Sequence, residues 1–152
     1  LIEGADARLE LGGTVFELRH RGGGHTPGDM MVWLPQSRLL FAGDIVYVDR
    51  LLAVIPVSNT KTWLAAFAVI EALAPTKIVP GHGRVTDLAT AQAQTRDYLA
   101  ALRERMKRAV DEGLDPSVAA RSFDGKAWGQ LFNAAELMPG NASRVYLEVE
   151  RE

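Results

Sequence analysis

The first part of the chain alternates apolar with polar residues in short runs, the pattern of half-buried β-strands. Residues 7–11 and 14–20 alternate in this way on either side of Gly12-Gly13. Two consecutive glycines accept the positive φ angles of a tight turn, so these runs predict a β-hairpin. A second pair of strands is predicted over 29–34 and 38–42. The run over 29–34 is apolar without a break from its second residue, which favours a strand covered on both faces.

The pattern then changes to helical spacing. Residues 60–73 are apolar almost all round, so they predict a deeply buried helix that ends before Pro75. Residues 77–79 predict a short strand, and 87–112 predict a long helix with apolar residues at three- and four-residue steps along one face. Further helices are predicted from Asp115-Pro116, over 128–137 and over 143–150.

This order of elements predicts an α/β or α+β layer, in which mostly antiparallel strands are followed by helices. With 152 residues, 47% of them hydrophobic, the chain is long enough for one core. We therefore expect a single domain over 1–152, with the sheet and the loops of interest over 7–83 and the helices over 87–150.

Charge and composition exclude several classes of function. The 17 Lys and Arg residues nearly balance the 19 Asp and Glu residues, so no field for binding nucleic acid is expected. The longest apolar run, 63–70, is too short to cross a membrane, and the absence of cysteine excludes disulfides and thiolate ligands. Because the chain starts at Leu1 without a signal-like segment, we expect a processed or truncated product of unknown compartment.

Three short segments near strand ends each present a side chain that can bind a transition metal. His25 lies in Gly24-His25-Thr26-Pro27-Gly28-Asp29, Asp44 ends Phe41-Ala42-Gly43-Asp44, and His82 lies in Pro80-Gly81-His82-Gly83. Two histidines and an aspartate suit Zn²⁺, Mn²⁺ or Fe better than Ca²⁺ or Mg²⁺, which prefer oxygen ligands. Each segment alone is better explained as a turn, but the three together favour a metal site on loops fixed by the sheet.

Two further polar residues near these segments have weaker interpretations. Asp29 either orients His25 or a neighbouring loop as a supporting carboxylate, or simply begins its strand. His20 lies between Arg19 and Arg21, and we expect it to be a surface residue rather than a ligand.

These three segments, together with Val32-Trp33-Leu34-Pro35 and Leu39-Leu40, resemble the second half of metallo-β-lactamase-fold hydrolases over about residues 7–112. In that superfamily, the complete fold is a four-layer αβ/βα sandwich of two similar halves, with two metal ions, usually zinc, at its edge. The resemblance implies that His25 completes the histidines of the first metal. It also implies that Asp44 bridges the metals or binds the second one, and that His82 binds the second metal.

The first-half signature of the superfamily, His-x-His-x-Asp-His, is absent, because the chain contains just three histidines. We therefore expect one or two zinc ions in a complete site, and weak binding or none by this chain alone. The sheet face that the other half would cover should be an exposed apolar surface. The expected partner is either the missing N-terminal half or a second copy in a homodimer, besides a small-molecule substrate.

The function that the resemblance implies is metal-dependent hydrolysis, in which hydroxide attacks an ester, thioester, amide or similar bond. Asp44 stands where some β-lactamases have a cysteine ligand, and no lysine follows it before Lys61, which argues against a true β-lactamase. The alternative is a non-catalytic half-domain that acts as a dimerisation or interaction module and keeps His25, Asp44 and His82 as relics.

Overall fold

The computed structural model describes residues 6–152, so the first five residues of the predicted domain lie outside the described part. Its sheet has five strands in the order β1-β2-β3-β4-β5, antiparallel except for the parallel pair β4–β5. The strands are β1 (Asp6–Leu11), β2 (Thr14–His20), β3 (Met30–Leu34), β4 (Leu39–Tyr47) and β5 (Lys77–His82). The predicted hairpin is confirmed, and its turn needs glycine because Gly12 and Gly13 have φ angles of 58° and 78°.

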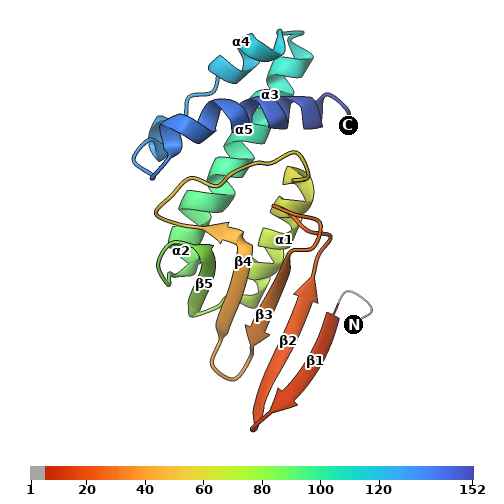
Figure 1. Ribbon diagram of the computed structural model, residues 1–152, viewed down its shortest axis with the longest axis vertical. Helices are drawn as coiled ribbons and strands as arrows, with labels where there is room; N and C mark the ends of the chain where they lie inside the picture. Colours follow the sequence, from red (N-terminus) through yellow and green to blue (C-terminus); the bar gives the residue numbers. More distant parts are fainter. Residues whose placement is uncertain (1–5) are drawn as a thin grey trace.

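The helices gather on one side and at one end of this sheet, which confirms the predicted α+β class (Figure 1). They are α1 (Thr60–Leu73), α2 (Leu88–Ala91), the π-helical segment η1 (Gln92–Arg96), α3 (Asp97–Asp111), α4 (Pro116–Arg121), the short 3₁₀ turn η2 (Lys126–Trp128) and α5 (Ala134–Val149). Figure 1 shows α3 leading away from the sheet to α4 and α5, at the end opposite the β1–β2 turn. Among residues 6–152, no helix combines the length and hydrophobicity that a bilayer crossing requires.

The helix predicted over 87–112 is present, but a π-helical segment interrupts it. It begins with a cap, in which the Asp87 side chain accepts a hydrogen bond from the Thr90 amide. Its predicted stripe is buried at every position except Leu88, which is half-buried: Ala91, Thr95, Tyr98, Leu102, Met106 and Ala109 have no exposed surface. Thr95 lies in η1, so the wider turn places a polar hydroxyl on the core side of the helix.

The prediction of two helices over 128–137 and 143–150 is wrong. The structure has one helix, α5, which begins at Ala134 and continues through Pro139 to Val149. Proline costs a backbone hydrogen bond inside a helix, yet this helix continues because Ala142, Val145 and its other apolar residues pack into the core. Tertiary packing outweighs the local helix-breaking signal here.

The two faces of the sheet differ, which corrects the expectation that one of its strands is covered on both faces. Met31 and Trp33 of β3 are buried in the hydrophobic core to which α1 also contributes, whereas Met30 is 38% exposed on the opposite face. Helix α1 likewise buries one side and leaves Ala65 and Ala68 exposed. The expectation that this strand is covered on both faces is therefore wrong for the described chain, whereas the deep burial predicted for the helix is confirmed for Trp63, Phe67 and Ile70, which have no exposed surface.

Candidate metal centre

A bulge in β4 sets the position of Asp44. The parallel pairing of β4 with β5 matches Gly43 with Pro80 and Tyr47 with His82, so residues 44–46 face Gly81 alone. The extra residues bend β4 and interrupt the regular alternation of its side chains between the two faces of the sheet. Asp44 was expected on a loop after the strand, but it lies within this irregular stretch of β4.

Gly81 allows the close approach of the two strands at this bulge. A Cβ atom at position 81 would lie 2.1 Å from Oδ1 of Asp44 and 2.7 Å from the carbonyl carbon of Gly43. Real Cβ atoms do not come so close, and the backbone of Gly43 cannot move aside as a flexible side chain would. Glycine is therefore required at position 81 for Asp44 to lie against β5.

His25 is held from both its backbone and its ring. Its Nδ1 lies 2.9 Å from the carbonyl oxygen of Ala53, and its own carbonyl accepts a hydrogen bond of 2.8 Å from the Ser58 hydroxyl. Its ring meets Trp63 edge-on, with the ring centroids 5.6 Å apart. These contacts orient Nε2 toward Asp44, whose Oδ2 is 3.7 Å away.

The tautomer of His25 follows from its partner. Because a carbonyl oxygen only accepts, Nδ1 carries the ring proton and neutral His25 leaves a bare lone pair on Nε2. In this neutral tautomer the Nε2 lone pair faces Oδ2 of Asp44 at 3.7 Å, so both facing atoms are acceptors. A cation between the two atoms would relieve this arrangement.

The distances fit a metal ion, although the site is only partial. Two atoms bound to one zinc ion at about 2.1 Å lie about 3.4 Å apart in a tetrahedral shell. The distances from Asp44 to the Nε2 atoms of His25 and His82, 3.7 and 3.6 Å, are close to this value. The two histidines face different oxygens of Asp44 and do not surround one point. Over residues 6–152, no set of three or more His, Asp or Glu side chains forms a ready metal site.

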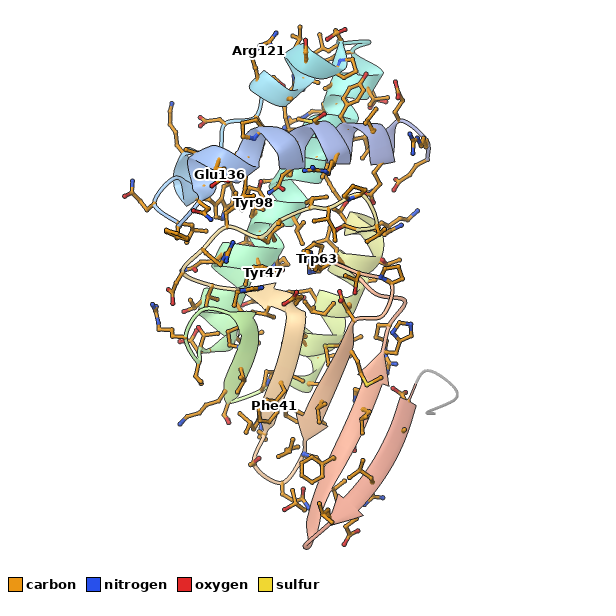
Figure 2. All side chains as sticks on the ribbon, in the orientation of Figure 1. Phe41, Tyr47, Trp63, Tyr98, Arg121 and Glu136 are labelled. Atoms are coloured by element: carbon orange, nitrogen blue, oxygen red, sulfur yellow. The ribbon has the colours of Figure 1, made fainter. Side chains whose placement is uncertain are left out.

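His82 is held more loosely than His25. It ends β5 and stacks on Tyr47, with ring centroids 4.6 Å apart and planes at 25°. Burial raises the pKa of the Tyr47 hydroxyl, and the charge of Asp44 and a hydrogen bond to it raise that pKa further. Tyr47 therefore stays protonated and donates to Asp44. Figure 2 shows Tyr47 and Trp63 together, near the end of β4 that lies far from Phe41.

The sequence patterns did not single out Tyr47 or the residues that hold its backbone. The hydroxyl of Thr95 accepts from the Tyr47 amide at 3.0 Å and donates to the Tyr47 carbonyl at 2.6 Å. The side chain of Gln94 accepts from the Asp49 amide at 2.7 Å. Both Thr95 and Gln94 belong to the π-helical segment. The sequence signal that could have identified this contact was a polar residue, Thr95, within an otherwise apolar stripe of the helix.

Asp29 lies in the same loop as His25 but bonds to a different residue. Its two carboxylate oxygens accept from the amide and hydroxyl of Thr26, at 3.0 and 2.6 Å, and so close the loop that carries His25. A role for Asp29 in orienting a ligand stays a prediction. His20 is half-buried rather than on the surface, and its Nδ1 lies 2.9 Å from the Asp29 carbonyl oxygen.

The candidate centre lies on an open edge of the molecule. None of the three surface cavities identified among residues 6–152 is lined by His25, Asp44 or His82. The side chains of Asp44 and His82 remain 34% and 41% exposed. In the part of the chain that the structure describes, the Asp44 and His82 side of the candidate centre is therefore partly open to solvent.

Comparisons with known proteins identify the family. The model of the metallo-beta-lactamase superfamily matches residues 5–82, about half of the chain, and no curated protein sequence matches. The sec-alkylsulfatase Pisa1 from Pseudomonas sp. has a similar structure, with a TM-score of 0.77 and 21% identity over 95% of this chain and 25% of its own.

Two metallo-β-lactamase structures are also similar to this chain. The enzyme from Pontibacter korlensis gives a TM-score of 0.57 and 28% identity, covering 62% of this chain and 46% of its own. DIM-1 gives 0.56 and 27%, covering 64% of this chain and 45% of its own. The chain thus spans less than half the length of each of these three structures. The chain belongs to the metallo-beta-lactamase superfamily.

Proposed function

We propose that this chain forms part of the active site of a zinc-dependent hydrolase that cleaves an ester, thioester, amide or similar bond of a small molecule. Membership of the superfamily supports the class, and similar structures named as a sulfatase and as β-lactamases support hydrolysis. The observation that carries the proposal is the bare Nε2 of His25 facing the carboxylate of Asp44.

The residues have distinct roles in this proposal. His25, Asp44 and His82 would hold zinc, and the two carboxylate oxygens of Asp44 each face one of the two histidines. Bound zinc supplies a Lewis acid and activates water at neutral pH. The hydroxyl of Tyr47 donates to Asp44 and steadies its carboxylate, because burial keeps this hydroxyl protonated.

We further propose that another polypeptide segment completes the site and covers the open sheet face. That face carries Leu9, Leu11 and Phe41, which are 45%, 73% and 41% exposed. Leu9 pairs with Phe16, two residues before Leu18, and Leu18 pairs with Val32, which in turn pairs with Phe41, so these apolar side chains share one face of the sheet from β1 to β4. The partner is either the other half of the superfamily's sandwich or a second copy of this chain.

Metal content measured by mass spectrometry on protein purified without chelator, followed by calorimetric titration with zinc, tests the first proposal. We expect weak zinc binding that His25→Ala, Asp44→Asn and His82→Ala each abolish. His20→Ala is the matched control, because His20 faces a backbone carbonyl rather than Asp44 and should leave binding unchanged.

Absence of zinc binding by the folded chain would contradict zinc ligation by the chain alone. Equal binding by His20→Ala and His82→Ala would show that the ligands are assigned wrongly. If the chain mixed with a covering partner also binds no zinc, an interaction module with relic ligands becomes the better reading.

Sedimentation velocity over a wide concentration range tests whether the partner is a second copy of this chain. A second copy predicts a dimer that forms as the concentration rises and that Phe41→Lys disrupts. Val57→Lys is the control, since Val57 is 56% exposed but lies between β4 and α1, outside the sheet. A monomer at all concentrations would exclude the homodimer.

A further inference from the structure

The acceptor for the His25 ring lies in a segment with little regular structure of its own. Residues 48–59 connect β4 to α1, and Ala53 lies in their middle. An irregular segment of this length needs outside contacts to hold one conformation. The orientation of the His25 ring therefore depends on the contacts that fix the backbone around Ala53.

Asn141 of α5 fixes that backbone on both sides of Ala53. Its Oδ1 accepts from the Val54 amide at 2.8 Å, and its Nδ2 donates to the Leu52 carbonyl at 2.8 Å. The same Nδ2 lies 3.0 Å from the Tyr98 hydroxyl. The Asn141 side chain has no exposed surface, so water does not compete for these bonds.

We infer that Asn141 is a positioning residue for His25, acting through the Ala53 carbonyl. It holds the two peptide groups next to Ala53 so that this carbonyl points at Nδ1, which keeps the proton on Nδ1 and the Nε2 lone pair toward Asp44. As far as it concerns metal binding, this inference rests on the proposed function; as far as it concerns the His25 tautomer, it does not.

A second set of contacts from the same helix supports this role. Glu148, two turns after Asn141, accepts from the Thr60 amide and hydroxyl at 2.9 and 2.8 Å, at the start of α1. The neighbouring Asn59 amide donates to the Gly24 carbonyl at 2.9 Å. Helix α5 thus contacts both the backbone around Ala53 and the start of α1, the two segments that surround His25. It does so although it lies more than a hundred residues later in the chain.

The test reads the tautomer of His25 in the metal-free full chain, using long-range proton–nitrogen NMR of the imidazole rings. His20→Gln and His82→Gln assign the signals, because the chain contains three histidines. We expect a single Nδ1–H tautomer in the wild type, and a mixture with Nε2–H in Asn141→Leu and Asn141→Asp. Asn141→Asp retains the acceptor for Val54 and loses the donor to Leu52, so it tests the pair of bonds if the leucine variant does not fold.

Two controls separate positioning from general stability. Tyr98→Phe removes the third partner of Asn141 while keeping both bonds to the segment, and should leave the tautomer unchanged. Val145→Ala removes buried volume from the same helix without touching the segment's hydrogen bonds, and should lower stability with the tautomer retained.

Zinc titration gives the second readout. Loss of a partner behind a metal-ligating histidine typically costs 10- to 100-fold in affinity, and we expect about tenfold for the Asn141 variants because Asn141 acts one step further away. A changed tautomer in a chain that binds no zinc would contradict zinc ligation by the chain alone and would still support this inference. An Nε2–H tautomer in the wild type, or an unchanged tautomer in a folded Asn141 variant, would overturn it.

Discussion

The two histidines beside Asp44 differ in how the protein holds them. The side chain of His25 is 13% exposed, bonds through Nδ1 to the Ala53 carbonyl and packs against Trp63. The side chain of His82 is 41% exposed and lies against one ring, that of Tyr47. One candidate ligand is oriented by the fold before any metal arrives, whereas the orientation of the other depends on a single stacking contact.

This difference shows which side of the candidate centre the described chain supports and which side it leaves exposed. The side of the centre near His25 is backed by α1, by residues 48–59 and, through them, by α5. The side near His82 faces the exposed edge. A partner that completes the site would therefore act mainly on the His82 side, and would order a ligand that this chain leaves loosely held.

The largest effect should come from Gly81→Ala. The added methyl group would overlap the Asp44 carboxylate and the Gly43 backbone, so we expect a loss of about 3 kcal/mol in the free energy of unfolding, together with loss of zinc binding. Chemical denaturation and zinc calorimetry measure the two effects.

Gly28→Ala is the matched control for this change. Gly28 lies in the His25 loop, and a Cβ atom there would meet no heavy atom within 4 Å. We expect a change below about 0.5 kcal/mol, as for most unconstrained surface sites. Equal tolerance of alanine at both positions would show that the close contact between β4 and β5 is unimportant.

A second comparison separates His25 from His82 in the metal-free protein. His25→Ala leaves the Ala53 carbonyl without its donor and removes a ring packed against Trp63, so we expect a loss of about 2 kcal/mol in unfolding free energy. His82→Ala should cost less than about 0.5 kcal/mol, because the side chain is 41% exposed and, among the described residues, makes no hydrogen bond comparable to that of His25 with Ala53. Similar costs for the two variants in urea denaturation would contradict the proposed difference between the two sides.

Much of this arrangement could be predicted from the sequence where local chemistry dictates it. The turn at Gly12-Gly13 and the apolar stripe of 87–112 follow from turn and helix rules, and the structure confirms them. The proximity of the two histidines to Asp44 followed from three motifs at strand ends.

The features that the sequence did not predict depend on contacts between segments that are distant along the chain. The continuation of α5 through Pro139 is decided by core packing, which no local rule predicts. The bulge that places Asp44 inside β4 arises from the pairing with β5. The hydrogen bonds of Asn141 join residues 87 and 89 positions apart in the chain, so no periodic pattern could reveal them.

A smaller effect is expected from Thr95→Val, which tests whether η1 fixes the ring on which His82 lies. Valine has a similar shape, but it removes both hydrogen bonds to the Tyr47 backbone. We expect a loss of about 1–2 kcal/mol in unfolding free energy, because a buried amide and carbonyl lose their partner. Ring-current shifts in the NMR spectrum should change more at His82 than at His25, because the Tyr47 ring centroid lies 4.6 Å from that of His82 and 5.8 Å from that of His25. Unchanged His82 shifts would show that η1 does not position this side of the centre.

Tyr47→Phe should have a smaller effect than Thr95→Val. Phenylalanine keeps the stack with His82 and removes the hydroxyl that donates to Asp44, so we expect a loss of about 0.5 kcal/mol in unfolding free energy. Because Asp44 is partly exposed, water replaces the lost donor and limits this cost. Tyr47→Leu also removes the stack, and should weaken zinc binding more than Tyr47→Phe. If the two variants bind zinc equally well, the stack does not hold His82, and the loosely held side of the centre depends on the partner alone.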